Sequence, residues 1–192
     1  NDVPIQKILK EQGYTSALIT DTYHFRAPGM NYHKWFDCYR WIRGQEYDPW
    51  VSSPSKRSIE EYVNENYSEW WRRNIGQFLS NTDNFHNEDD WFPATVVDEA
   101  CRWLKDNRCQ KNVLLWVDSF DPHEPWDPPK RFDTYTDPSY TGKRLIMPMG
   151  GPMTDWATPQ EIDYIRGLYA GEVSFVDHCL GKLFNCLEEE GY

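Results

Sequence analysis

Two helix-then-strand units constrain the fold of this chain more than any other feature. Apolar residues at helical spacing begin at Ile5 and stop before Gly13, and a short apolar strand, TSALIT, follows at 15–20. The pattern recurs with a helix capped by Thr95 and the strand NVLLWVD at 112–118. A helix with one apolar face needs a sheet to cover. The alternation therefore predicts an α/β fold.

A third element is a long helix near the end of the sequence. Thr158–Glu161 combine a capping box with proline at the first helical position, and Gly191 is a typical stop. Between them, apolar residues keep a 3,4 spacing, which predicts one buried face. This predicted face consists of Ile162, Ile165, Tyr169, Val173, Val176, Leu180, Leu183 and Leu187. Gly167, Gly171 and Gly181 interrupt the pattern, which predicts a kink or a close packing contact.

The remaining sequence is irregular, and the predicted strands are few. Residues 21–93 form a Trp- and Pro-rich loop region in which only Ser58–Leu79 is expected to be helical. Two strands are too few to cover the apolar faces of the helices. The sequence also stops after a helix terminator, where the alternation would place another strand. We therefore expect residues 1–192 to be an internal part of one larger α/β domain.

Charge and cysteine usage exclude several classes of protein. The 192 residues contain 20 Lys and Arg against 31 Asp and Glu, a net charge of -11 with no basic stripe, so nucleic acid is not an expected partner. No apolar run approaches the roughly 18 residues of a membrane span, so a membrane is not expected either. Five cysteines without a C-x-x-C pair predict free, buried thiols. The compartment stays open between cytoplasm and periplasm, and the oligomeric state stays open too.

A histidine follows each predicted strand. His24 comes shortly after the first strand, and His123 after the second. In open α/β sheets, ligands gather beyond the carboxyl ends of the strands. If the two strands are parallel, both imidazoles lie at one sheet edge, where they could bind one anionic oxygen or protonate a leaving group. Pro122 and Pro125 restrict the backbone around His123, which favours a fixed side chain.

Three other interpretations of these residues remain open. Each histidine could simply form local hydrogen bonds at its strand end. The acidic residues around His123 (Asp118, Asp121, Glu124 and Asp127) could instead bind a hard cation with it. The tryptophans of the loop region could stack on sugar rings, although packing of the loop onto the domain is the favoured interpretation. These tryptophans are Trp35, Trp41, Trp50, Trp70, Trp71 and Trp91.

Three stretches together resemble the sulfatase family of the alkaline-phosphatase superfamily. The segment 119–129, SFDPHEPWDPP, is similar to the family pattern P-H-x-P-(aromatic)-x-P-P that follows a strand. The stretch from Tyr169 to Leu187 resembles the long family helix Y-x-(A/G)-x-V-x-x-V-D. Residues 5–20 resemble the family's opening helix-strand unit. The resemblance implies an alkaline-phosphatase-like mixed sheet flanked by helices, present here only in part.

The resemblance also implies an activity and a set of site residues. It implies a hydrolase of small-molecule or carbohydrate sulfate esters that uses formylglycine and a divalent cation, usually Ca²⁺, in the full-length enzyme. His24 and His123 match the family's two catalytic histidines. Thr22 and Trp126 match substrate-binding positions, but Thr22 stands where the family pattern G-K-x-H has lysine. Because the positive charge of that lysine is missing here, a phosphonate or phosphodiester hydrolase of the same superfamily remains an alternative.

Other parts of the family pattern are missing from this sequence. No cysteine lies in the C/S-x-P-x-R motif that yields formylglycine. Ser52–Arg57 imitates the serine form, but Lys56 replaces its arginine and the segment follows His24 instead of preceding the first strand, so we reject it as the nucleophile. Metal ligands are not expected in this segment either. We therefore expect the segment alone to be inactive, with a non-catalytic carbohydrate-binding module as the alternative from another class.

Overall fold

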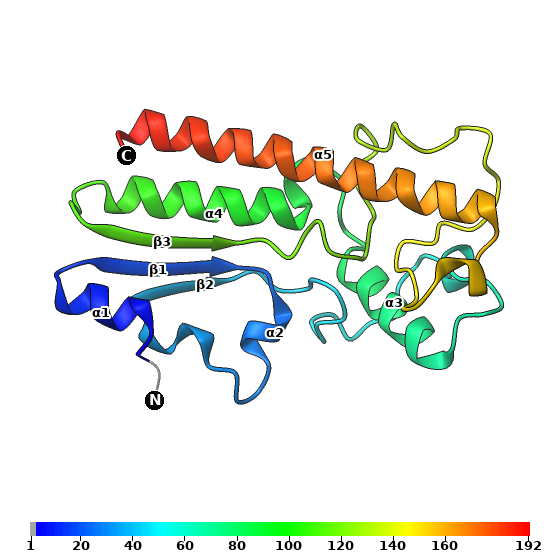
Figure 1. Ribbon diagram of the computed structural model, residues 1–192, viewed down its shortest axis with the longest axis horizontal. Helices are drawn as coiled ribbons and strands as arrows, with labels where there is room; N and C mark the ends of the chain where they lie inside the picture. The colour runs from blue at the N-terminus through cyan, green and yellow to red at the C-terminus, as the bar shows by residue number, and fades with distance from the viewer. Residues whose placement is uncertain (1–2) are drawn as a thin grey trace.

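The computed structural model describes residues 3–192, and Figure 1 shows its helices and strands around a small sheet. In chain order the elements are α1 (Ile5–Glu11), β1 (Thr15–Thr20), α2 (Tyr23–Arg26), β2 (Cys38–Trp41), α3 (Glu69–Asn81), α4 (Phe92–Asn107), β3 (Val113–Asp118) and α5 (Pro159–Glu190). Single 3-10 turns lie at Tyr32–Trp35, Ile59–Glu61, Glu88–Asp90 and Met153–Asp155.

The sheet is parallel, with strand order β2-β1-β3. Ala17 pairs with Cys38 on one side and with Leu115 on the other, so β1 is the central strand. Both predicted strands are confirmed, and so is the α/β fold with helices packed on a sheet. Strand β2 was not predicted because its four residues, CYRW, lie in the polar loop region and offer no apolar alternation.

Helices α4 and α5 lie together over one face of the sheet (Figure 1). Side chains of a strand alternate between faces, and Ala17 and Ile19 point to these helices together with Leu115 and Val117. On the helices they meet Val96, Ala100, Leu104, Phe175, Cys179 and Leu183. Each large side chain that is fully buried in such a core contributes about 1.5–3 kcal/mol. This core holds β1 and β3 side by side and so fixes where their carboxyl ends lie.

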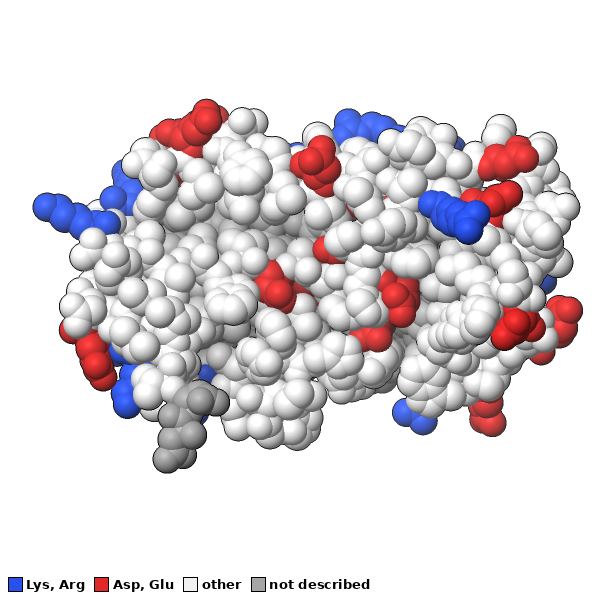
Figure 2. Space-filling model, viewed as in Figure 1, with Lys and Arg blue, Asp and Glu red and all other residues white. Residues whose placement is uncertain are grey.

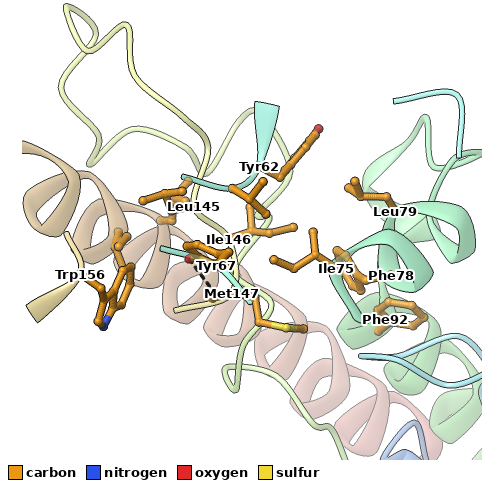
Figure 3. Packing of buried hydrophobic residues seen from close by; sticks show 13 residues of the cluster. Tyr62, Tyr67, Ile75, Phe78, Leu79, Phe92, Leu145, Ile146, Met147 and Trp156 are labelled. Carbon is orange, nitrogen blue, oxygen red and sulfur yellow. Dashed lines mark hydrogen bonds between the residues drawn. The ribbon is translucent and has the colours of Figure 1, made fainter. Parts of the chain in front are cut away.

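A second core lies beyond the sheet and is built largely from loop residues (Figure 3). Ile75, Phe78 and Leu79 of α3 pack there with Leu145 and Ile146. The hydroxyl of Tyr67 donates a 3.0 Å hydrogen bond to the carbonyl oxygen of Met147. Other members are Tyr62, Val63, Phe92, Trp156, Ile165 and Leu168, with Trp71 and Trp126 packed against them. Part of the irregular, aromatic-rich sequence therefore forms a packed layer, as the favoured interpretation of the loop expected.

Two of the expected helix starts are wrong. Helix α4 begins at Phe92, and Thr95 lies inside its first turn, where its hydroxyl donates to the carbonyl oxygen of Trp91 at 3.2 Å. The expected helix at Ser58–Leu79 is a 3-10 turn, a loop and then α3. The side-chain oxygen of Asn64 accepts a hydrogen bond from the backbone N–H of Asn66, a local turn that competes with helix.

Helix α5 confirms its predicted boundaries but only part of its predicted buried face, of which Ile165 and Leu183 are buried. The Thr158 hydroxyl accepts from the N–H of Glu161, and Gly191 ends the helix in the left-handed conformation at φ 78°. The buried side chains follow the register Ile165, Leu168, Glu172, Phe175, Cys179 and Leu183. Tyr169, Val173 and Leu180 are exposed, and Glu172, which the prediction left out, is buried.

Two glycines of α5 allow the close contact that the sequence suggested. A Cβ added to Gly167 would lie 2.8 Å from the carbonyl oxygen of Tyr135, and one added to Gly171 would lie 2.7 Å from that of Phe132. The loop over 132–136 therefore rests directly on the helix backbone. For Gly181, no atom of residues 3–192 lies within 4 Å of such a Cβ, so no contact with this part of the chain explains the glycine.

Helix α1 differs from expectation in the face that it buries. Ile5 and Ile8 are exposed, while Gln6 is its buried residue. The helix contacts β1, but its apolar residues do not pack into either core. The predicted packing of this apolar face on the sheet is therefore wrong for the part of the chain that is described.

The surface agrees with the acidic composition. Lys and Arg lie mostly toward the outline of the face in Figure 2, while Asp and Glu also lie near its middle. No helix among residues 3–192 combines the length and apolar character needed to cross a membrane. The five cysteines are free, as predicted, but only Cys179 is fully buried.

Candidate functional site

The parallel pairing of β1 and β3 brings the two histidine-bearing segments to one sheet edge. Thr20 and Asp118, the last residues of the two strands, are partners in the register. After β1 the chain enters the short helix α2, which includes His24. After β3 it makes a tight turn in which the N–H of His123 donates to the carbonyl oxygen of Phe120 at 3.0 Å. The peptide bonds before Pro122 and Pro125 are both cis.

The aromatic ring of Phe120 contacts both imidazoles. Its centroid lies 5.8 Å from that of His24 and 4.2 Å from that of His123. The side chains of His24 and His123 are 45% and 50% exposed, so both rings are open to solvent. The geometry therefore gathers the two predicted catalytic histidines around one phenylalanine at this edge of the sheet.

Each histidine has a carboxylate neighbour. Nε2 of His24 lies 3.0 Å from Oε2 of Glu46, and Nδ1 of His123 lies 3.1 Å from Oε2 of Glu124. Burial raises the pKa of Glu46, while the charges of His24 and His123 act in the opposite direction. A carboxylate beside an imidazole favours the protonated ring and selects which ring nitrogen holds hydrogen.

Two carboxyl groups that follow the strands, those of Asp21 and Asp121, form hydrogen bonds to neighbouring segments. Oδ1 of Asp21 accepts a 2.7 Å hydrogen bond from the N–H of Phe120. Oδ1 of Asp121 accepts a 2.8 Å bond from the side-chain amide of Gln45. Burial raises the pKa of Asp21 to about 7 and that of Asp121 well above its usual range. These two carboxyl groups are buried structural links between the loops.

The two predicted substrate-binding residues have partners inside the protein. The Thr22 side chain is buried, and its hydroxyl donates to Oδ2 of Asp118, which also accepts from Thr20 at 2.7 Å. The indole N–H of Trp126 donates to the carbonyl oxygen of Pro122 at 3.0 Å, and its ring lies 5.0 Å from that of Tyr169. Their assignment to substrate binding stays a prediction.

The acidic residues near His123 do not converge as the cation interpretation requires. Asp118 accepts from two threonines and Asp121 from Gln45, while Asp127 pairs with Arg144 at 2.8 Å. Within residues 3–192, no three His, Cys, Asp or Glu side chains are grouped so that they could hold a metal ion. Among residues 3–192 the acidic side chains therefore do not form a site for the divalent cation that the resemblance implies.

The Ser52–Arg57 segment has a structural role. The Ser55 hydroxyl donates to Asp83 at 2.6 Å, and the Arg57 guanidinium donates to the carbonyl oxygen of Leu79 at 2.7 Å. The segment thus ties the loop to α3.

Sequence reasoning missed the contribution of the loop over 43–48. This loop supplies both Gln45 and Glu46 to the histidine-bearing edge. It has no hydrophobic periodicity, and its one sequence signal is the opposite charge of Arg43 and Asp48 around a glycine. That signal predicts a turn but does not place the turn next to His24.

Comparison with known proteins identifies the family. The family model "Sulfatase" matches residues 2–192. Among solved structures, the phosphonate monoester hydrolase of Agrobacterium radiobacter superposes with a TM-score of 0.60 at 15% identity, over 98% of this chain and 44% of that protein. The protein yidJ of Bacteroides fragilis, provisionally described as a sulfatase, superposes with a TM-score of 0.51 at 22% identity. This match covers 97% of this chain and 40% of that protein.

Another structural match is Ps i-CgsB, solved in complex with k-i-k-neocarrahexaose, with a TM-score of 0.49 at 19% identity, over 97% of this chain and 36% of that protein. This chain thus spans 36–44% of the length of these three solved proteins. The search of curated protein sequences gave no match. A family model that matches nearly every residue decides the assignment: the chain belongs to the sulfatase family.

Proposed function

We propose that the protein containing this chain hydrolyses sulfate esters of small molecules or carbohydrates, with His24 and His123 at the scissile ester. The observation that supports the proposal is the pair of half-exposed imidazoles around Phe120, at the carboxyl edge of the parallel β1–β3 pair. Ligands of open α/β sheets bind at this edge. Membership in the sulfatase family supports hydrolysis of sulfate esters as the reaction class.

The chemistry of the reaction suits two imidazoles. Transfer of a sulfuryl group leaves negative charge on the departing alkoxide oxygen and on the sulfuryl oxygens. One imidazolium can donate a proton to the departing oxygen, and the other can donate a hydrogen bond to a sulfuryl oxygen. Positioned acid catalysis of this kind contributes about 10²- to 10⁴-fold to a rate.

In this proposal the nucleophile comes from sequence outside the chain, as does the cation site. Residues 1–192 then form an internal part of one catalytic domain and are inactive alone. Formylglycine, when present, supplies the nucleophile of this family. The residues of this chain bind and orient the ester.

The same fold also suits a phosphonate or phosphodiester hydrolase, and Thr22 favours keeping this second candidate. Thr22 stands at the lysine position of the family pattern and directs its hydroxyl to Asp118. That position therefore brings no cation to a bound sulfate. One sulfate contact of the family pattern is thus missing, and the superposition on a phosphonate monoester hydrolase supports keeping both ester classes as candidates.

The deciding experiment assays the whole protein on a sulfate ester and a phosphonate ester with the same leaving group. The proposal expects the higher kcat/KM on the sulfate ester. A large preference for the phosphonate ester would assign the protein to the second candidate. Exposed Trp50 and Trp70 allow one more outcome: saturable polysaccharide binding without turnover of either ester would indicate a carbohydrate-binding module.

A further inference from the structure

The loop over 43–48 is held in one conformation by its own hydrogen bonds. The guanidinium of Arg43 donates to both carboxylate oxygens of Asp48, at 2.6 and 2.8 Å. The N–H of Gly44 also donates to Asp48, at 3.0 Å. From α3, the side-chain amide of Asn81 donates to the carbonyl oxygens of Gly44 and Asp48, both at 2.8 Å. Such a loop can hold a side chain in a fixed place.

The two residues at the tip of this loop reach the two histidine-bearing segments. Gln45 is buried, and its side-chain amide donates to Asp121, two positions before His123. The side-chain oxygen of Gln45 accepts the N–H of Glu46 at 2.9 Å. Glu46 has a φ of 54°, a left-handed conformation that is uncommon for any residue with a side chain. An outlier held in place by its surroundings is a reason to look for function.

The carboxylate of Glu46 faces His24. Its Oε2 lies 3.0 Å from Nε2 of His24, in a side chain that is 11% exposed. This oxygen is buried, and no hydrogen-bond donor among residues 3–192 is aligned with it. The ion-pair contact with His24 is therefore the polar contact that the described residues offer it. The other charged groups that act on Glu46 are His123 and Glu124 from the loop after β3, and Tyr47 follows it in the chain.

We propose that Glu46 is a positioning residue for His24, which it holds with hydrogen on Nε2, so that Nδ1 is the atom that faces the ester. This inference rests on the proposed function. The negative charge beside Nε2 favours hydrogen on that nitrogen in the neutral ring, which leaves Nδ1 as the acceptor. In the imidazolium, Nδ1–H can donate to the ester while the carboxylate balances the positive charge of the ring. Loss of a proton from Nδ1 to the departing oxygen leaves the neutral Nε2–H ring.

The substitution that isolates this role is Glu46→Gln, which keeps the shape of the side chain and removes its charge. An amide can present N–H to Nε2 and so stabilise the wrong tautomer of the ring, an error that costs orders of magnitude in kcat when a histidine is catalytic. In the whole protein we expect kcat on a sulfate ester to fall about 10²-fold with little change in KM. Glu65→Gln, at an exposed site, is the matched control and should leave kcat unchanged.

A double-mutant cycle separates positioning from a general structural role. If Glu46 acts through His24, then Glu46→Gln has little further effect on kcat in the His24→Ala background. The pH profile gives a second readout. Because burial raises the pKa of Glu46, its protonation should contribute an acid-side loss of kcat, which Glu46→Gln lacks.

The ¹⁵N chemical shifts of the His24 ring report its tautomer without any need for activity. The inference expects hydrogen on Nε2 of the neutral ring in the wild-type protein and a changed tautomer in Glu46→Gln. Hydrogen on Nδ1 in the wild type would overturn it, as would an unchanged kcat in an active enzyme or an equal effect of Glu46→Gln with and without His24. If the protein hydrolyses neither ester but shows the expected tautomers, the proposed function fails while the Glu46–His24 contact stands.

Discussion

The backbone N–H of Phe120 donates a 2.7 Å hydrogen bond to the carboxylate of Asp21, a residue 99 positions earlier in the chain. Asp21 directly follows β1, and Phe120 follows β3 after one intervening residue. The bond therefore ties the two strand ends together beyond the sheet. The ring of Phe120 contacts both His24 and His123. The hydrogen bond from Phe120 to Asp21 therefore also positions the phenylalanine between the two histidines.

Replacing Asp21 by alanine should loosen this arrangement. The variant Asp21→Ala leaves the partly buried N–H of Phe120 without its carboxylate partner, which costs about 1–3 kcal/mol of folding free energy. We expect at least a roughly 10-fold fall in kcat as well, since the histidines lose their common support. Asp21→Asn keeps an acceptor oxygen and should retain more of both properties. Denaturant unfolding and turnover of the whole protein measure the two effects, and wild-type values for Asp21→Ala would refute the role of this bond.

The pH dependence of stability should reflect the buried carboxyl group of Glu172. Burial raises the pKa of Glu172 to about 8, from an ordinary value of 4.5. Between these two pH values the folded protein holds a proton that the unfolded chain has lost. The stabilising effect of this proton is complete below about pH 4.5 and is lost as the pH rises toward about 8. Across this pH range the free energy of unfolding falls by a few kcal/mol.

The substitution Glu172→Gln should flatten this dependence and stabilise the protein at pH 8. The measurement is the free energy of unfolding of both proteins at a series of pH values, with the exposed Glu65→Gln as control. Asp121 contributes a slope of the same sign, because its pKa is also raised by burial. An unchanged slope in Glu172→Gln would show that Glu172 is already ionised in the folded protein.

Two glycines of α5 offer a matched pair of substitutions. In Gly171→Ala the new methyl group would meet the carbonyl oxygen of Phe132 at 2.7 Å and a ring carbon of Pro128 at 2.9 Å. Such overpacking costs about 1–3 kcal/mol. In Gly181→Ala the methyl group meets nothing within 4 Å, so the better helix propensity of alanine should stabilise by about 0.5–1 kcal/mol. Unfolding curves that rank the two variants in the reverse order would contradict the close packing of the 132–136 loop.

The elements that the sequence predicted correctly are those whose signals are local. The strands near 15–20 and 113–118 are apolar runs, and the boundaries of α5 follow from the Thr158 cap and from Gly191. The predicted buried face of α5 was partly wrong because Glu172 is buried. Its burial depends on packing against residues distant in the sequence, which the polarity of a glutamate does not predict. The start of α4 was wrong because the helix begins at Phe92 without a side-chain cap.

The same contrast holds for the site. Parallel strands with a histidine after each were enough to place His24 and His123 at one edge. The contribution of Gln45 and Glu46 could not be predicted, because it depends on contacts between the 43–48 loop and residues as distant as Asn81 and Asp121. Hydrogen bonds between residues so far apart in the chain produce no periodic pattern of hydrophobic residues in the sequence.

The most direct test of the account is the turnover of a sulfate ester by the whole protein and by its His24→Ala, His123→Ala and double variants, with folding checked by circular dichroism. The account predicts that each single substitution lowers kcat/KM about 10²-fold or more. It also predicts that the double variant loses less than the product of the two effects, because the histidines act on one ester. Unchanged turnover in either folded single variant would remove that histidine from the reaction and contradict the account.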